Sequence, residues 1–222
     1  LGTAPLVGFP DDNCWYPPGT LTAVLDAFAA DPALAVLSGR QTTEDGRPSM
    51  LRWLPRPAAV TRRTFMRTTI MSTMFFRRAE VDRAGGFDDA LGVGSAGWHG
   101  AGEESALLLA IVDAGGPARY EPALTVLQEE PRDAVDEAFV AKMLSYGCGM
   151  GHLWRSHRLP LDQLAWYSAR KAGAVLVRTA TGRRTQARAD LAYLRGTVAG
   201  YRGRPPRELA HRAAASTTGP GA

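Results

Sequence analysis

The hydrophobic pattern changes near Pro131, and this change constrains the fold more than any other feature of the sequence. Before Pro131, short apolar runs of strand length alternate with segments of helical periodicity. After Pro131, only helical periodicity is present. Strands that alternate with helices, followed by helices alone, predict an α/β domain with a helical extension. We therefore expect an α/β domain over residues 1–131, a basic helical extension over 132–212 and a frayed tail over 213–222.

The individual elements follow from apolar spacing and from the positions of glycine and proline. Strands are expected over residues 4–9, 33–38, 70–76 and 123–127. A first helix is expected after Pro17-Pro18, with Leu21, Val24, Leu25 and Phe28 at helical spacing. Further helices are expected over residues 77–84, 103–114, 134–146, 160–180 and 184–200. Five glycines between residues 92 and 102 predict a mobile loop.

Length and composition exclude several classes of protein. The 222 residues are 45% hydrophobic and 22% charged, as in ordinary globular domains. No run approaches the ~18–20 apolar residues of a membrane span. The two cysteines, Cys14 and Cys148, are too few for a disulfide framework or a structural zinc site, which favours a cytoplasmic location. Leu1 enters an apolar run directly, so we expect no signal peptide and a start inside a longer natural sequence.

Charge is unevenly distributed. Basic residues outnumber acidic ones in residues 141–222, whereas acidic residues predominate before them. Of the 26 basic residues, all but Lys142 and Lys171 are arginines. A GC-rich coding bias is the preferred explanation, and an acidic partner is the alternative. No nucleic-acid recognition motif is present, so no nucleic-acid partner is expected. The helix over 160–180 is expected to pack on the α/β domain, with a position on a membrane surface as the alternative.

Two adjacent carboxylates, Asp11 and Asp12, follow the first expected strand. The ends of strands in open α/β sheets are common ligand sites, and carboxylate oxygens suit Mg²⁺ or Mn²⁺. A turn in which aspartate caps the next helix explains the same residues without a ligand. The pair is thus a candidate metal site that needs support from other motifs.

A second pair of carboxylates, Glu103 and Glu104, follows the glycine-rich segment at the start of a helix. A carboxylate that is partly desolvated beside a loop can act as a general base. Acidic residues in a first helical turn are also favoured by the helix dipole alone. Trp98 and His99 lie on the same segment, where they either face a substrate or belong to the core and an exposed loop, respectively.

The order of the motifs adds to what each one indicates. Asp-Asp after a strand is followed by Arg77–Val81, by Gly-Gly-Phe-Asp at 85–88, by Gly-Glu-Glu at 102–104 and by Tyr-Glu-Pro at 120–122. Over residues 5–130 this order resembles family 2 glycosyltransferases. The resemblance implies the C-terminal part of a GT-A (Rossmann-like) domain and an inverting transfer of sugar from a nucleotide-diphosphate donor to an acceptor hydroxyl.

The resemblance also implies roles for single residues. Asp12 matches the ligand of the divalent cation, Mn²⁺ or Mg²⁺, and Asp11 the carboxylate beside it. Glu104, preceded by Glu103, matches the catalytic base, although the family usually has aspartate there. Trp98, His99, Gly102 and Gln128 are the residues expected near the substrates, and Gln128 stands where many members have a histidine.

The largest departure from the family is at the N-terminus, where the strands that form the nucleotide pocket would precede Asp11 by several dozen residues. A non-catalytic binding or docking module with a basic tail is therefore the alternative function. For the enzyme, the expected acceptor is a glycan or a lipid-linked sugar of the cell envelope. The expected location is the cytoplasm, with peripheral contact at the inner face of the membrane left open.

Overall fold

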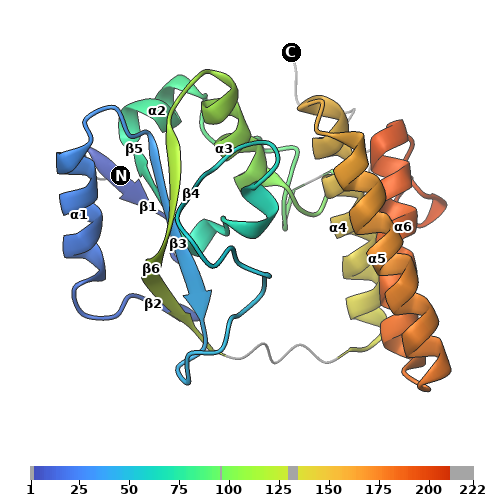
Figure 1. The fold of residues 1–222 in the computed structure, drawn as a ribbon. Coiled ribbons are helices and arrows are strands. Elements are labelled where there is room, and N and C mark those ends of the chain that lie inside the picture. The colour runs from blue at the N-terminus through green and yellow to red at the C-terminus, as the bar shows by residue number, and fades with distance from the viewer. Residues whose placement is uncertain (1–2, 96, 130–134, 211–222) are drawn as a thin grey trace, which may run out of the picture. The chain divides into compact units, whose positions relative to one another are not determined.

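In the computed structural model, residues 3–95, 97–129 and 135–210 are described. They form two compact units. The first, an α/β unit, comprises residues up to 87 together with residues from 107 onward to the end of the sheet. The second, a helical unit, comprises 88–106 and the C-terminal helices. Residues 88–106, which the sequence pattern groups with the α/β domain, thus cluster with the helices that follow it (Figure 1).

The α/β unit contains a mixed sheet with the strand order β1-β5-β3-β6-β2, and β4 pairs with β6 beside this path. Only β3 and β6 are parallel, and the other pairings are antiparallel. The strands are β1 (Leu6–Gly8), β2 (Cys14–Trp15), β3 (Val36–Thr42), β4 (Ala58–Ala59), β5 (Met74–Arg77) and β6 (Ala118–Gln128). Within the described residues, β1 pairs on one side only, so it is an edge strand.

Helices cover both faces of this sheet. Helix α1 (Thr20–Ala30) lies on one face and α3 (Glu103–Asp113) on the other, and the short helix α2 (Arg78–Arg83) follows β5 (Figure 1). Val24 and Phe28 of α1 pack with Leu37, Phe75 and other buried residues. On α3, Leu107, Leu108, Leu109 and Ile111 are buried. This burial of an apolar helix stripe against the sheet is the main stabilising contribution in the unit.

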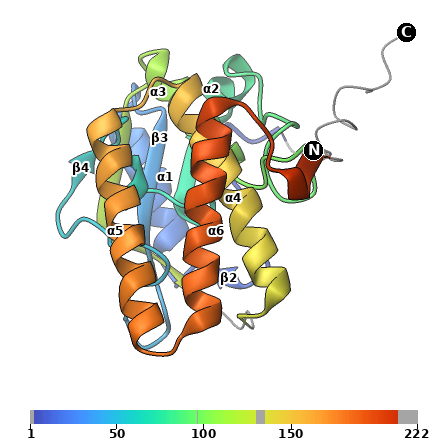
Figure 2. The same cartoon turned by 90° about the vertical axis from the view of Figure 1, so that its right-hand side faces the viewer.

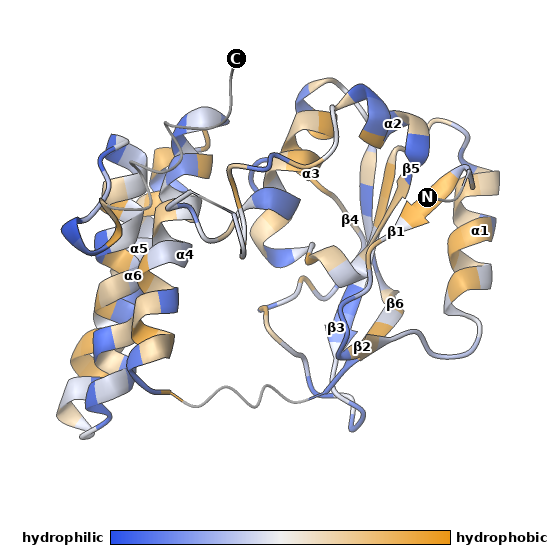
Figure 3. Ribbon diagram, turned by 180° about the vertical axis from the view of Figure 1, so that it is seen from behind, coloured by the Kyte–Doolittle hydropathy of each residue, from blue (hydrophilic) through white to orange (hydrophobic). Residues whose placement is uncertain are grey.

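Strand β6 carries an irregularity where it passes β3. Ser38 pairs with Tyr120, but Arg40 already pairs with Thr125, so β6 has three extra residues between these two pairs. A Cβ at Gly39 would lie 2.3 Å from the carbonyl oxygen of Leu124, so only glycine fits beside the bulge. The C-terminal half of β3 is hydrophilic, in contrast to β1 (Figure 3).

In the helical unit, α6 (Arg184–Arg202) lies between α4 (Glu137–Ser156) and α5 (Leu161–Ala180) (Figure 2). Helices α4 and α6 approach very closely because glycines occupy the contact. A Cβ at Gly147 would lie 2.1 Å from the Tyr193 carbonyl oxygen, and one at Gly200 would lie 1.9 Å from that of Cys148. Gly151 and Gly196 face backbone at similarly short distances. Small residues at positions i and i+4 thus set the spacing of the two helices.

The observed elements confirm the mixed α/β architecture with helices at the C-terminus, and they correct several details. Val24 and Phe28 are buried, but Leu21 and Leu25 are exposed by 53% and 59%. Strand β3 begins later and runs further than residues 33–38, and β6 begins before residue 123. Helix α4 extends to Ser156, well beyond residue 146. None of the helices in the described residues combines the length and the apolar character needed to cross a membrane.

Candidate functional site

The acidic turn, Asp11–Asn13, connects the edge strand β1 to β2 in the α/β unit. The N–H of Cys14 donates to the carbonyl oxygen of Asp11 (3.2 Å), which closes the turn. Both aspartates are exposed, whereas Cys14 is half-buried beneath them. The turn therefore presents two adjacent carboxylates to solvent at the end of β1.

A buried polar network supports this turn from the sheet. Gln41 of β3, fully buried, donates through Nε2 to Cys14 Sγ (3.2 Å) and to Ser72 Oγ (3.0 Å). The Cys14 thiol in turn lies 4.0 Å from Asp11 Oδ2. The Oε1 atom of Gln41 is buried and has no hydrogen-bond partner among the described residues. Sequence reasoning missed this network, because Gln41 and Ser72 are distant from the acidic turn along the chain.

The environment of Asp11 alters its acidity. Partial desolvation, the larger effect, and the negative charge of Asp12 both raise the pKa of Asp11. A hydrogen bond with the Ser72 side chain opposes these two effects. Two adjacent negative charges attract a cation, because a positive charge between them relieves the repulsion. The same desolvation and nearby acidic charges raise the pKa of the Cys14 thiol, so Cys14 remains protonated at neutral pH.

Strand pairing brings Gln128 next to the acidic turn. Cys14 pairs with Gln128 across β2 and β6, and the N–H of Glu129 donates to the carbonyl oxygen of Asn13 (3.0 Å). Gln128 is only 7% exposed, and its Oε1 accepts a hydrogen bond from Ser49 (2.7 Å). The oxygen through which glutamine would bind a cation is thus engaged by Ser49. Gln128 holds the end of β6 beside the turn.

The turn offers two carboxylates as possible ligands of a divalent cation. In the described parts of the chain, no group of three or more His, Cys, Asp or Glu side chains is arranged to hold a metal ion. Mg²⁺ is commonly bound by one or two carboxylates, with substrate phosphates and waters completing its shell. Asp11 and Asp12 provide that number of hard oxygen ligands, so the residues present suit Mg²⁺ or Mn²⁺.

The second candidate region, residues 97–104 of the helical unit, runs along α4. The N–H of Gly100 donates to the carbonyl oxygen of Ser145 (3.0 Å). The hydroxyl of Ser145 donates in turn to the carbonyl oxygen of Trp98 (3.3 Å). A Cβ at Gly149 would lie 1.9 Å from the Ala101 carbonyl oxygen, so the segment touches the α4 backbone there. The expected mobile loop is therefore fixed at its C-terminal half by contacts with α4.

Trp98 and His99 both pack inward. Trp98 is 8% exposed and belongs to a core cluster with Leu144 and Cys148. The His99 ring lies between the rings of Trp98 (4.0 Å between centroids) and His152 (4.4 Å). Burial and then the charge of His152 lower the pKa of His99 to about 4, against an opposing effect of Asp88. His99 is therefore neutral at pH 7, and Trp98 has a structural role as a core residue.

Gly102, Glu103 and Glu104 form the start of α3. Gly102 has a φ of 107°, and its carbonyl oxygen accepts a hydrogen bond from Ala106 (2.7 Å). The carboxylate of Glu103 lies against the Gly92 backbone, where a Cβ would be 2.6 Å from its carboxyl carbon. Glu104 occupies the same first turn, where the helix dipole stabilises a negative charge. Glu103 thus contacts the preceding loop, and Glu104 stays the candidate base that the resemblance implies.

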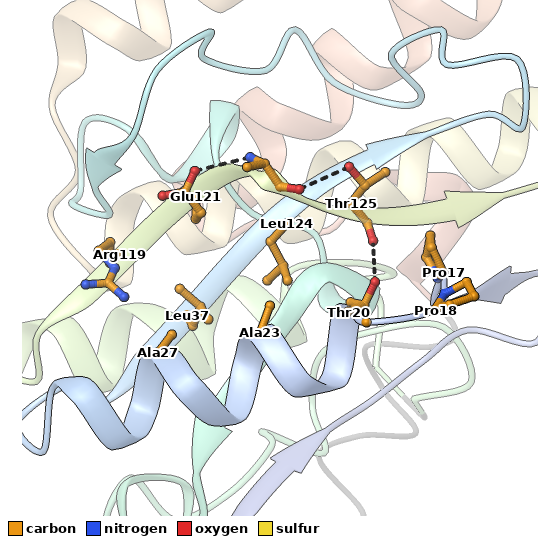
Figure 4. Close-up of a pocket in the computed structure, with 12 residues that line it drawn as sticks. Pro17, Pro18, Thr20, Ala23, Ala27, Leu37, Arg119, Glu121, Leu124 and Thr125 are labelled. Atoms are coloured by element: carbon orange, nitrogen blue, oxygen red, sulfur yellow. Dashed lines mark hydrogen bonds between the residues drawn. The ribbon is translucent and has the colours of Figure 1, made fainter.

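A groove of about 520 Å³ between α1 and the strands β3 and β6 was not predicted from the sequence (Figure 4). Its lining is mostly apolar, with Arg119, Glu121 and Thr125 as the larger polar residues. Glu121 Oε1 accepts a hydrogen bond from the Ala123 N–H (3.2 Å). The groove therefore contains a single carboxylate, already bonded to the β6 bulge, and differs in chemistry from the acidic turn.

Comparisons with protein-family models, curated proteins and solved structures found no significant match to the chain. The structure brings Asp11, Asp12 and Gln128 together in the α/β unit. It brings Trp98, His99, Gly102 and Glu103 together in the helical unit, with Glu104 beside them in sequence. The acidic turn and the glutamate pair belong to different units, so their convergence on one substrate stays a prediction.

Proposed function

We propose that this chain is the catalytic part of an inverting glycosyltransferase that uses a nucleotide-diphosphate sugar and a divalent cation. The observation that carries the proposal is the acidic turn. Two exposed carboxylates follow an edge strand, and the end of β6 and a buried polar network hold them in place. The motif order that resembles family 2 glycosyltransferases gives this turn its proposed ligand.

The proposed roles follow from the chemistry of sugar transfer. Asp11 and Asp12 would hold the cation that stabilises the negative charge of the departing nucleoside diphosphate. Glu104 would accept the proton of the acceptor hydroxyl. At the same time the hydroxyl oxygen would form a bond to the anomeric carbon of the donor sugar. The bond from that carbon to the diphosphate oxygen breaks at the same time, which inverts the configuration.

The contacts of the helical unit support a positioning role for α4. Ser145 and Gly149 fix residues 98–101, and Gly102 then begins α3. A general base must lie within hydrogen-bond reach of the proton it accepts, so a fixed approach to Glu104 favours catalysis. In this proposal α4 limits the movement of the segment that carries Glu104.

Calorimetric titration with Mn²⁺ and a panel of nucleotide-diphosphate sugars tests the proposal. The chain should bind one of these donors only when Mn²⁺ is present. Asp12→Asn should abolish this binding, because one of the two carboxylate ligands is lost. Asp26→Asn, an exposed position on α1, is the matched control and should bind like the wild type.

Transfer assays separate the enzyme from a docking module. Glu104→Gln should retain donor binding but lose release of the nucleoside diphosphate in the presence of an acceptor. Absence of donor binding by the chain would reject the enzyme and favour the docking module.

A further inference from the structure

Helix α5 turns two of its four charged side chains toward α6, whereas the other two, Asp162 and Arg170, are exposed. Lys171 and Arg178 both bind the carboxylate of Asp190, with 2.7 Å between Lys171 Nζ and Asp190 Oδ1. Asp190 is only 3% exposed, so it needs these two cations to compensate its burial. Tyr167 completes this inner side by an edge contact with Trp154 of α4.

The opposite side of α5, its outer face, is exposed and mostly apolar. None of the twenty residues of α5 is buried. The exposed fractions of Leu161, Trp166, Leu176 and Val177 are 58%, 62%, 73% and 63%. The outer face consists of these four residues, the small exposed residues Ala165, Ala169, Ala172, Gly173 and Ala180, and the exposed polar residues Asp162, Arg170 and Thr179. At 3.6 residues per turn, they cover about half of the helix circumference.

The exposure of four large apolar side chains on α5 is unusual for a helix in a globular protein. Such helices bury the apolar stripe and expose the charged residues. Here the ion pairs and the half-buried Leu164, Tyr167 and Val175 lie on the inner side, and the larger apolar residues of the outer face remain in water. A contiguous exposed apolar surface of this kind marks a site of interaction with an apolar partner.

The charges around α5 indicate what that partner is. Residues 141–222 contain 14 lysines and arginines but only 3 acidic residues. Arg155 and Arg158 before α5, and Arg183 and Arg184 after it, are all exposed. A second copy of the chain would bring two such positive segments together, which is unfavourable. An anionic lipid surface offers both an apolar interior and negative head groups.

We propose that the outer face of α5 docks on an anionic phospholipid bilayer, with the helix axis in the plane of the membrane. Leu161, Trp166, Leu176 and Val177 insert among the acyl chains, and the flanking arginines bind the head groups. Trp166 suits the boundary, because its ring is apolar and its N–H is polar. This inference needs no sugar donor and is independent of the proposed activity.

Vesicle flotation tests the inference with the full chain. The protein should float with phosphatidylcholine vesicles that contain phosphatidylglycerol, and added salt should weaken the binding. Leu176→Glu should reduce the affinity at least about tenfold, because a charge replaces an inserted apolar side chain. Leu25→Glu, on the exposed side of α1, is the matched control and should float like the wild type. Circular dichroism verifies that both variants are folded.

Several results would overturn the inference. Absence of flotation with anionic vesicles would do so, as would equal binding to pure phosphatidylcholine. Equal loss in the two variants would show that α5 is not the docking surface. A concentration-dependent dimer in sedimentation velocity that Leu176→Glu disrupts would assign the outer face to a second copy instead.

Discussion

Gln41 illustrates how a single buried residue supports a site far away in sequence. Its amide nitrogen donates to Cys14 Sγ and Ser72 Oγ, and both of these groups interact with Asp11. A polar residue in a strand usually indicates a solvent-facing position, so the sequence alone does not indicate that Gln41 is buried. Only the pairing of β3 with β5 and the position of β2 make this role visible.

His99 gives a prediction about pH at the same scale. Its pKa is lowered to about 4 in the folded protein by burial and by His152, whereas an unfolded histidine has a pKa of about 6.5. The unfolded chain therefore binds more protons between these values, and stability falls as the pH falls from 6.5 toward 4. Replacing His99 by glutamine should reduce the loss of unfolding free energy between pH 7 and pH 5 by about 1–2 kcal/mol.

Urea unfolding followed by tryptophan fluorescence measures this difference. His152 has a pKa that is lowered by burial as well, so part of the pH dependence should persist in the variant. Between pH 7 and pH 8 the His99→Gln protein and the wild type should change almost in parallel, because His99 is mostly neutral in both the folded and the unfolded state there. An identical loss between pH 7 and pH 5 in the two proteins would show that His99 is not the group concerned.

At the scale of elements, the contact between α4 and α6 predicts how glycine substitutions change the free energy of unfolding. A Cβ at Gly147 would meet the Tyr193 carbonyl oxygen at 2.1 Å, whereas a Cβ at Gly173 on α5 has no neighbour within 4 Å. Gly147→Ala should therefore lower the unfolding free energy by about 1–3 kcal/mol, because the helices must separate. Gly173→Ala should leave it unchanged or raise it by up to about 1 kcal/mol, because alanine favours helix.

Chemical denaturation of both variants, followed by circular dichroism, provides the comparison. The two substitutions are chemically identical and both lie in helices, so helix propensity contributes equally. Stabilisation of both variants to the same extent would contradict the close packing of α4 on α6.

The sequence predicted elements well where the local pattern is strong. Helices α5 and α6 begin where their apolar spacing begins, and α3 starts at Glu103 as expected. The sequence pattern did not predict β2 or β4, because strands of two residues are too short to show any periodicity. The polar end of β3 was missed because its partner strands, not its own residues, hold it in the sheet.

The candidate sites show the same limit. Adjacent residues such as Asp11 and Asp12, or Glu103 and Glu104, were found because each pair is contiguous in the sequence. Residues that act through tertiary contacts, such as His152 beneath His99 or Ser49 on Gln128, have no sequence signal. The sequence leaves open whether Trp98 faces a substrate or belongs to the core, and only its exposed fraction of 8% assigns it to the core.

At the scale of the whole molecule, the proposed reaction needs both units. The proposed cation ligands Asp11 and Asp12 lie in the α/β unit, and the proposed base Glu104 lies in the helical unit at the start of α3. Transfer with inversion requires the leaving diphosphate and the accepting base on opposite sides of one sugar ring. The central claim is therefore that the acidic turn and Glu104 converge when the donor is bound.

Paramagnetic broadening by Mn²⁺ tests this convergence most directly. With Mn²⁺ and a bound nucleotide-diphosphate sugar, the amide NMR signals of Asn13 and Gln128 should broaden, since both residues adjoin the acidic turn. The account predicts that the signals of Glu103 and Glu104 broaden as well, and that Asp12→Asn removes all of these effects. Broadening at Asn13 and Gln128 with unaltered signals at Glu103 and Glu104 would contradict it.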